Sequence, residues 1–136
     1  MDVYGVIIPI KSLSNYDLNH YAKLLKINHY RGNFMRDTLP KMPNKIESGI
    51  VNLDDSTGPG QHWVCYFINN NESFYFDSYG LEPPNEVFDY LKNGPLHYNT
   101  NEIQERGTVI CGHLCLYVLK SFSLGFSFKE IIFKLI

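Results

Sequence analysis

The sequence predicts an α+β fold in a single domain spanning residues 1–136, with a mixed, mostly antiparallel sheet packed against helices. Helix-like and strand-like segments follow one another in mixed order, unlike the regular alternation of a parallel βαβ sheet. Two apolar runs flank a short polar turn, and a nearly unbroken apolar helix lies near the C-terminal end. A chain of 136 residues is long enough to bury one hydrophobic core, and no repeat or linker divides it.

Composition favours an ordinary globular protein, with 44% hydrophobic and 15% aromatic residues. The net charge of −2 excludes a strongly basic nucleic-acid binder and leaves room for weak or local DNA contact. The odd number of cysteines, 3, argues against a secreted disulfide framework and favours an intracellular protein. No apolar run reaches membrane-spanning length, so we expect no membrane partner.

The first half of the chain predicts one helix and two extended segments. Residues 3–10 are apolar and form a strand or a packed extended segment. Ser14, with Asp17 three positions later, predicts a capped helix that ends by Asn28. Residues 30–45 hold two prolines and a glycine, which indicates an irregular connection.

The remaining elements follow from local signals as well. They are a strand over 47–53, a polar loop over 54–60, a hairpin over 62–77, a short helix over 85–91 begun by proline, a loop over 93–107 with one strand near Ile103, a buried helix over 111–122 ended by Gly125, and a last helix capped by Ser127 and Glu130.

The predicted hairpin places a histidine and an aspartate at its open end. If the turn is centred on residues 69–72, Ile68 faces Ser73, and His62 shares a face with Asp77 as its diagonal neighbour. Such neighbours lie about 7–8 Å apart, within reach of an imidazole and a carboxylate. Asp77 then fixes the tautomer of His62 and leaves its other nitrogen free to act as a base, whereas a one-residue slip separates the two.

Cys111 stands where a loop enters the buried helix. The free amide groups and the positive end of the helix dipole at that point favour a thiolate. Gly112 leaves room for a substrate backbone, and a nearby imidazolium lowers the thiol pKa further. Gln104, just before this loop, offers a side-chain amide as an oxyanion donor beside the Cys111 backbone N–H.

The runs QHW, YFDSYG and QERGTVICG together resemble the adenovirus-type (adenain-like) cysteine endopeptidases and their relatives, the SUMO-specific proteases. That superfamily carries His-Trp, then Asp or Glu, then Gln, then Cys-Gly, an order that His62, Asp77, Gln104 and Cys111 match. The stretch from FMRDTLP to QHWVCY is also similar to the proteases of Polinton (Maverick) elements and adenovirus-like viruses. The resemblance covers roughly residues 30 to 122 and implies a papain-like/adenain-like fold.

The resemblance implies a cysteine endopeptidase with a Cys-His-Asp triad that matures viral or transposon-encoded capsid precursors. Trp63 and Gly112 are then expected at the substrate. The chemistry requires no cofactor and no metal, while activation by DNA or a capsid-derived peptide is expected by analogy with the adenovirus enzyme. We expect a monomer that acts on a polypeptide in the host nucleus or the virion.

Two other functions stay open. One is a SUMO or ubiquitin-like protein isopeptidase, against which Ile110 argues, because SUMO proteases usually have an acidic residue before the cysteine. The other is a catalytically inactive binding module on the same fold.

Each candidate residue also has an ordinary structural interpretation. His62 suits a half-buried strand, Asp77 a turn, Cys111 a core thiol and Gln104 a loop. A zinc site at Cys111, His113 and Cys115 is disfavoured, because on a helix His113 points away from both cysteines.

Overall fold

A computed structural model describes residues 1–58 and 60–136. Its main sheet has five strands in the order β3-β4-β5-β6-β7, with bounds Tyr30–Met35, Ile46–Asn52, Trp63–Asn69, Glu72–Phe76 and Leu96–Tyr98. The two central pairings are antiparallel, whereas β3 and β7 run parallel to their neighbours. A separate two-stranded hairpin, β1 (Asp2–Val3) and β2 (Val6–Ile7), opens the chain.

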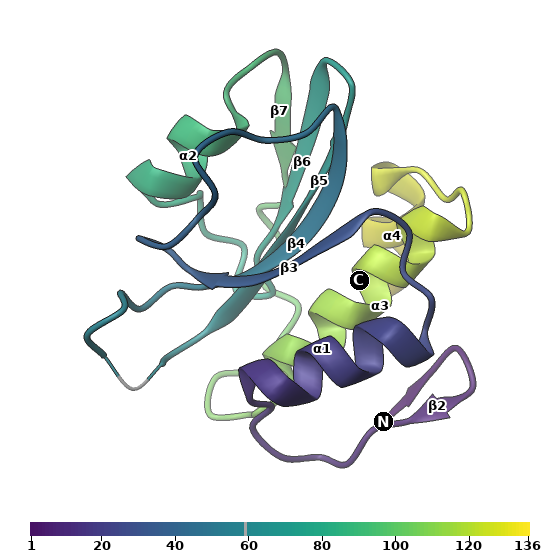
Figure 1. Cartoon of the computed structure of the whole chain (residues 1–136). Helices are drawn as coiled ribbons and strands as arrows, with labels where there is room; N and C mark the ends of the chain where they lie inside the picture. The colour runs from purple at the N-terminus through teal and green to yellow at the C-terminus, as the bar shows by residue number, and fades with distance from the viewer. Residues whose placement is uncertain (59) are drawn as a thin grey trace.

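Helices cover both faces of the main sheet (Figure 1). On one face lies α2 (Asn85–Leu91), and on the other lie α1 (Asn15–Leu24), α3 (Cys111–Ser123) and α4 (Phe128–Leu135). Alternate residues of a strand serve the two cores: Ile50 packs with the α3 side and Val51 with the α2 side. None of the helices in the described residues is both long and apolar enough to cross a membrane.

Most predictions from local signals are confirmed. Ser14 and Ser127 form capping boxes with Asp17 and Glu130 at the starts of α1 and α4. The apolar run from residue 111 forms α3, whose side chains are mostly buried. The sequence also predicted the positions of β4, β5, β6 and α2. The predictions for the elements around the candidate site are therefore confirmed.

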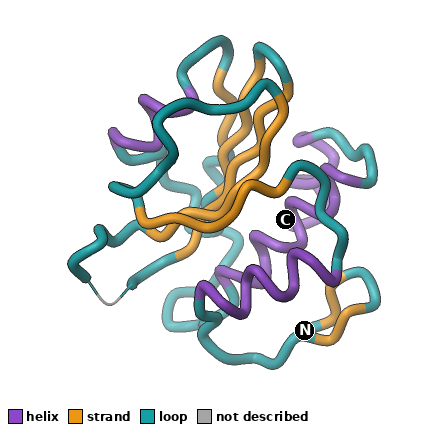
Figure 2. Tube along the Cα trace, in the orientation of Figure 1, coloured by secondary structure: helices purple, strands orange, loops and turns teal. Residues whose placement is uncertain are grey.

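Two predictions are wrong, and both concern edge strands of the sheet (Figure 2). Residues 30–35 form β3 rather than an irregular connection, with a register shift between Tyr30 and Gly32. The strand expected near Ile103 is absent there, and β7 lies earlier in the chain. Parallel edge strands are stabilised by pairing with a neighbour that is distant in sequence, so neither has a clear alternating pattern of its own.

Candidate active site

The β5–β6 hairpin brings His62 and Asp77 together at its open end. The register is as predicted, with Asn69 opposite Glu72 and pairing that continues to Cys65 opposite Phe76. His62 immediately precedes β5 and Asp77 immediately follows β6, and His62 Nε2 lies 2.7 Å from Asp77 Oδ1. The carboxylate can only accept at neutral pH, so Nε2 carries the hydrogen.

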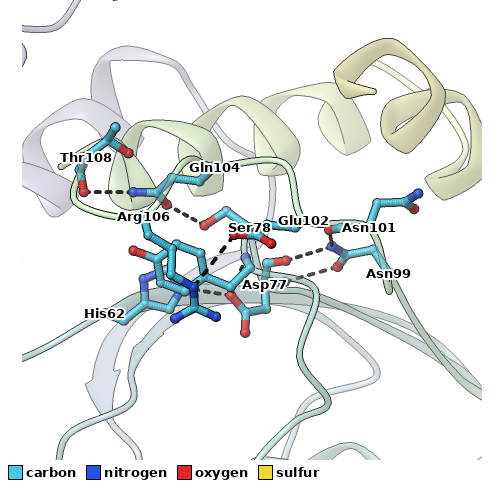
Figure 3. Close-up of polar contacts among 10 residues, drawn as sticks. His62, Asp77, Ser78, Asn99, Asn101, Glu102, Gln104, Arg106 and Thr108 are labelled. Atoms are coloured by element: carbon cyan, nitrogen blue, oxygen red, sulfur yellow. Dashed lines mark hydrogen bonds and ion pairs between the residues drawn. The ribbon is translucent and has the colours of Figure 1, made fainter.

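Asp77 is held rigidly by its surroundings (Figure 3). Its backbone N–H donates to Asn99 Oδ1 at 3.1 Å, and Asn99 Nδ2 donates back to the Asp77 carbonyl at 2.7 Å. The Tyr79 backbone N–H donates to Asp77 Oδ1 at 2.9 Å. Asp77 Oδ2 is buried without a hydrogen-bond partner in the part of the chain that the structure describes. One oxygen of the carboxylate therefore bonds to His62, and the other makes no hydrogen bond within the described residues.

The imidazole of His62 is oriented from its edge and from its face. Asp77 occupies Nε2, which leaves Nδ1 for its interaction with Cys111. The ring of Tyr79 stacks on the imidazole with centroids 4.4 Å apart and an interplanar angle of 11°. Arg106 lies over the Tyr79 ring, 4.8 Å from its centroid. These contacts restrict rotation of His62 about its side-chain bonds.

Cys111 is the first residue of α3 and is partly exposed. Burial alone raises the pKa of its thiol, but the hydrogen bond with His62, the backbone N–H groups of Trp63 and Gly112 and the charge of His62 lower the pKa below its ordinary value. Burial likewise lowers the pKa of His62, but hydrogen bonds to Asp77 and Cys111 raise it to about 9. The two groups thus favour a thiolate–imidazolium pair and titrate together.

Gln104 is buried and bridges two segments next to the site. Its Oε1 accepts from the Ser78 hydroxyl at 2.6 Å, and its Nε2 donates to the Thr108 carbonyl at 2.9 Å. The Thr108 carbonyl can only accept, which fixes the orientation of the amide. Gln104 is not among the described residues that line the cleft around Cys111. Its bonds hold the loop before Cys111 against the turn after Asp77, and its role as an oxyanion donor stays a prediction.

The space at Gly112 is used differently from what the sequence suggested. A Cβ atom at Gly112 would lie 3.2 Å from Leu18 Cδ2 and 3.3 Å from Leu13 Cδ1. The room that the glycine leaves is therefore taken by two core leucines of the same chain, and Gly112 does not line the described part of the cleft. Trp63 does line the cleft, and its contact with substrate stays a prediction.

A cleft of about 900 Å³ opens over these residues. His62, Trp63 and Cys111 line it together with residues 12–15 and 33–35. These segments come from the start of α1, from β3 and from the hairpin, so the cleft lies where the helical layer meets the sheet. A volume of this size is typical of sites that bind a small molecule or a short peptide segment.

Two residues of the site were missed by sequence reasoning. Tyr79 stacks on His62, and Asn99 fixes the backbone of Asp77. The aromatic two positions after Asp77 was a usable signal, since a turn ending in Gly80 brings residue 79 back toward the strand ends. Asn99 gave no signal, because it reaches the site only when its loop docks.

Across residues 1–58 and 60–136, no group of three or more His, Cys, Asp or Glu side chains is arranged to hold a metal ion. His113 instead donates from Nε2 to the Pro9 carbonyl at 2.8 Å, away from the two cysteines of α3.

Comparison with known proteins found similar proteases in African swine fever virus. No family model matches the chain. A cysteine protease of African swine fever virus is 28% identical over 96 residues, which cover 60% of this chain and 35% of the relative. A SUMO-1 cysteine protease from another isolate of that virus is 24% identical over 130 residues, covering 81% of this chain and 48% of the relative. The matched part of this chain thus spans about half the length of these relatives, or less.

Solved structures show the same likeness in three dimensions. The crystal structure of the African swine fever virus protease superimposes with a TM-score of 0.68 at 16% identity, covering 92% of this chain and 62% of that one. A selenomethionine form of that protease gives a TM-score of 0.65 at 18% identity. The chain therefore has the fold of this viral protease, and the predicted α+β, papain-like/adenain-like fold class is confirmed.

Proposed function

We propose that this chain is a cysteine endopeptidase with Cys111 as nucleophile, His62 as acid and base, and Asp77 as the residue that orients His62. The observation that carries this proposal is the 2.7 Å contact between Asp77 and His62 Nε2, which leaves Nδ1 of the same ring for the Cys111 thiol. The similarity to viral cysteine proteases in sequence and fold supports it independently.

The reaction proceeds by acyl transfer. The Cys111 thiolate attacks the scissile carbonyl carbon, and the C=O electron pair moves onto oxygen. Collapse of this intermediate breaks the C–N bond, and the leaving amine takes the proton from His62 Nδ1. Neutral His62 then removes a proton from water, whose oxygen attacks the thioester and releases the carboxylic acid and the Cys111 thiolate.

The negative oxygen of the intermediate needs hydrogen-bond donors. The backbone N–H of Cys111, in the first turn of α3, is one donor in this proposal. Gln104 is the second, through the N–H of its side-chain amide that does not bond to Thr108. Because the Gln104 amide is bonded to Ser78 and Thr108 and does not line the described part of the cleft, this role requires the amide to rotate toward the cleft in the substrate complex.

Labelling with a thiol-reactive peptide tests the nucleophile. A peptide vinyl sulfone should add once to the native protein, as read by intact mass, and should not add to Cys111→Ala. Cys65→Ala and Cys115→Ala are matched controls, because both thiols are buried and should leave labelling unchanged. Labelling of Cys111→Ala at the native rate, or none of the native protein under reducing conditions, would favour an inactive binding module.

The substrate class is a finer part of the proposal. We place viral or transposon-encoded capsid precursors first, cut within an extended segment beside small residues such as glycine. A SUMO isopeptidase is the second candidate, because relatives of this chain are named SUMO-1 cysteine proteases. Cleavage of a peptide library, compared with release from a fluorogenic SUMO conjugate, distinguishes them: faster turnover of the conjugate would favour the isopeptidase.

Activation and location belong to the same proposal. By analogy with the adenovirus enzyme, DNA or a capsid-derived peptide increases the rate, and the protein acts as a monomer in the host nucleus or virion. A peptidase rate that stays constant across a titration with duplex DNA would contradict the DNA part.

A further inference from the structure

Residues 9–14, here called the N-terminal strap, connect β2 to α1 and run below α1 in the view of Figure 1. Residues 12–14 of the strap line the same cleft as Cys111 and His62. The strap has no regular secondary structure, so its position depends on contacts with other elements.

Two side-chain donors attach the strap to the rest of the protein. Trp63 Nε1–H donates to the Leu13 carbonyl at 2.9 Å. His113 Nε2–H donates to the Pro9 carbonyl at 2.8 Å. Within the described residues, these are the only hydrogen bonds that join the strap to β5 and α3.

The two donors hold nearly the whole length of the strap, since they bond to its first residue and to its fifth. Trp63 is the residue after His62, and His113 is two residues after Cys111. The segments that present the reacting groups to the cleft therefore also hold one of its walls.

Packing supports this attachment. Leu13 is only 5% exposed and lies against Gly112, where a Cβ atom would come within 3.3 Å of Leu13 Cδ1. His113 is fully buried, and its Nδ1 has no hydrogen-bond partner in residues 1–58 and 60–136. The bond to Pro9 is therefore the one hydrogen bond that this buried imidazole makes within these residues. Breaking the hydrogen bond of a buried polar group is costly.

We propose that Trp63 and His113 are positioning residues that hold the N-terminal strap as one wall of the substrate cleft. This inference rests on the proposed peptidase function for its kinetic consequence. Neither side-chain donor bonds to the reacting atoms, so losing one loosens the wall and weakens substrate binding without changing the thiolate–imidazolium pair.

Four substitutions separate this role from a general effect on folding. Trp63→Phe removes the indole N–H and keeps an aromatic ring. His113→Leu removes the imidazole donor, whereas His113→Gln keeps an N–H that can reach the Pro9 carbonyl. His97→Leu is the matched control, since His97 bonds to Glu72 on the exposed surface of β7 and β6.

The first measurement needs no substrate. Hydrogen–deuterium exchange of the strap amides should be at least about threefold faster in Trp63→Phe and His113→Leu than in the native protein, and near native in His113→Gln and His97→Leu. Unchanged exchange in both donor-deletion variants would overturn the proposal, whether or not the protein proves to be a peptidase.

The second measurement is kinetic. We expect KM for a peptide substrate to rise about three- to tenfold in Trp63→Phe and His113→Leu, with kcat and the rate of Cys111 alkylation by iodoacetamide within about twofold of native. A fall in kcat and alkylation rate at constant KM would overturn the proposal, because these residues would then act on the reacting pair. A native protein that cleaves no peptide sinks the peptidase function, and the exchange experiment still decides the role of the strap.

Discussion

Two carboxylates, Glu47 in β4 and Asp77 directly after β6, are almost fully buried, yet their surroundings differ. Glu47 Oε1 accepts from Arg31 at 2.9 Å and from the Asn44 backbone N–H at 2.8 Å. Its Oε2 accepts from the hydroxyls of Tyr66 and Tyr90. Each oxygen of Glu47 has two donors, whereas one oxygen of Asp77 has none in the described residues.

The partners differ in kind as well as in number. Arginine stays charged at every physiological pH, and burial raises the pKa of both Tyr66 and Tyr90, so they stay protonated donors. Asp77 is bonded to an imidazole that can gain and lose a proton next to a cleft. A buried carboxylate with only permanent donors stabilises the fold, whereas one paired with a titrating group facing solvent is suited to chemistry.

Asp77→Asn should give the largest effect of the substitutions that test this contrast. An amide has no negative charge to stabilise the imidazolium, so kcat/KM should fall by about 10²- to 10⁴-fold. The unfolding midpoint should change little, because the amide oxygen still accepts from Tyr79. Steady-state kinetics and thermal unfolding measure the two quantities.

Asp89→Asn, an exposed carboxylate on α2, is the control for this substitution and should behave as native. If Asp77→Asn instead kept full activity and unfolded far more easily, Asp77 would resemble Glu47 and the contrast would fail.

Glu47→Gln should show the reverse pattern. One side of the new amide can no longer accept, and Arg31 loses its charged partner, so the free energy of unfolding should fall by about 1–3 kcal/mol. Peptidase activity of the folded protein should stay within about twofold of native. Urea denaturation gives the stability, and Glu72→Gln, exposed on β6, serves as the control with a change of at most about 0.5 kcal/mol.

The pH dependence of kcat/KM tests the titration of His62 and Cys111 without a substitution. Because the pKa of His62 is raised to about 9, the imidazolium that protonates the leaving amine is present below that pH and is lost above it. We expect kcat/KM to fall about tenfold per unit above pH 9. Alkylation of Cys111 should already be fast below the ordinary thiol pKa, because that pKa is lowered, and should not fall as His62 loses its proton.

Parallel decline of alkylation and kcat/KM above pH 9 would mean that the high-pH limb reflects unfolding. Circular dichroism at the same pH values separates that case from loss of the His62 proton.

Local sequence patterns were sufficient to predict the proximity of His62 and Asp77 and the start of α3. The short turn between β5 and β6 fixes the register, so the proximity of His62 and Asp77 followed from counting residues. The start of α3 at Cys111 followed from the apolar run after it. By contrast, β3 could not be predicted, because Arg31 and its neighbours are extended only through pairing with β4.

The loop of residues 99–108 shows the same limit. Gln104 was expected to donate to an oxyanion beside the Cys111 N–H, which stays a prediction, and its bonds to Ser78 and Thr108 were not expected. Gly112 was expected to admit substrate, and Leu13 and Leu18 fill that space. In both cases the neighbours of the residue come from segments that no local pattern connects to it.

The sequence by itself determined the caps, the hairpin register and the helix that begins at Cys111, because each depends on hydrogen bonds and side-chain periodicity between residues near in the chain. The tertiary structure alone decided how Cys111 reaches His62, which residues close the cleft and which carboxylate keeps an unused oxygen. Those features depend on which distant surfaces meet when the core forms, and burial of apolar area is not directional enough to be read from a linear pattern.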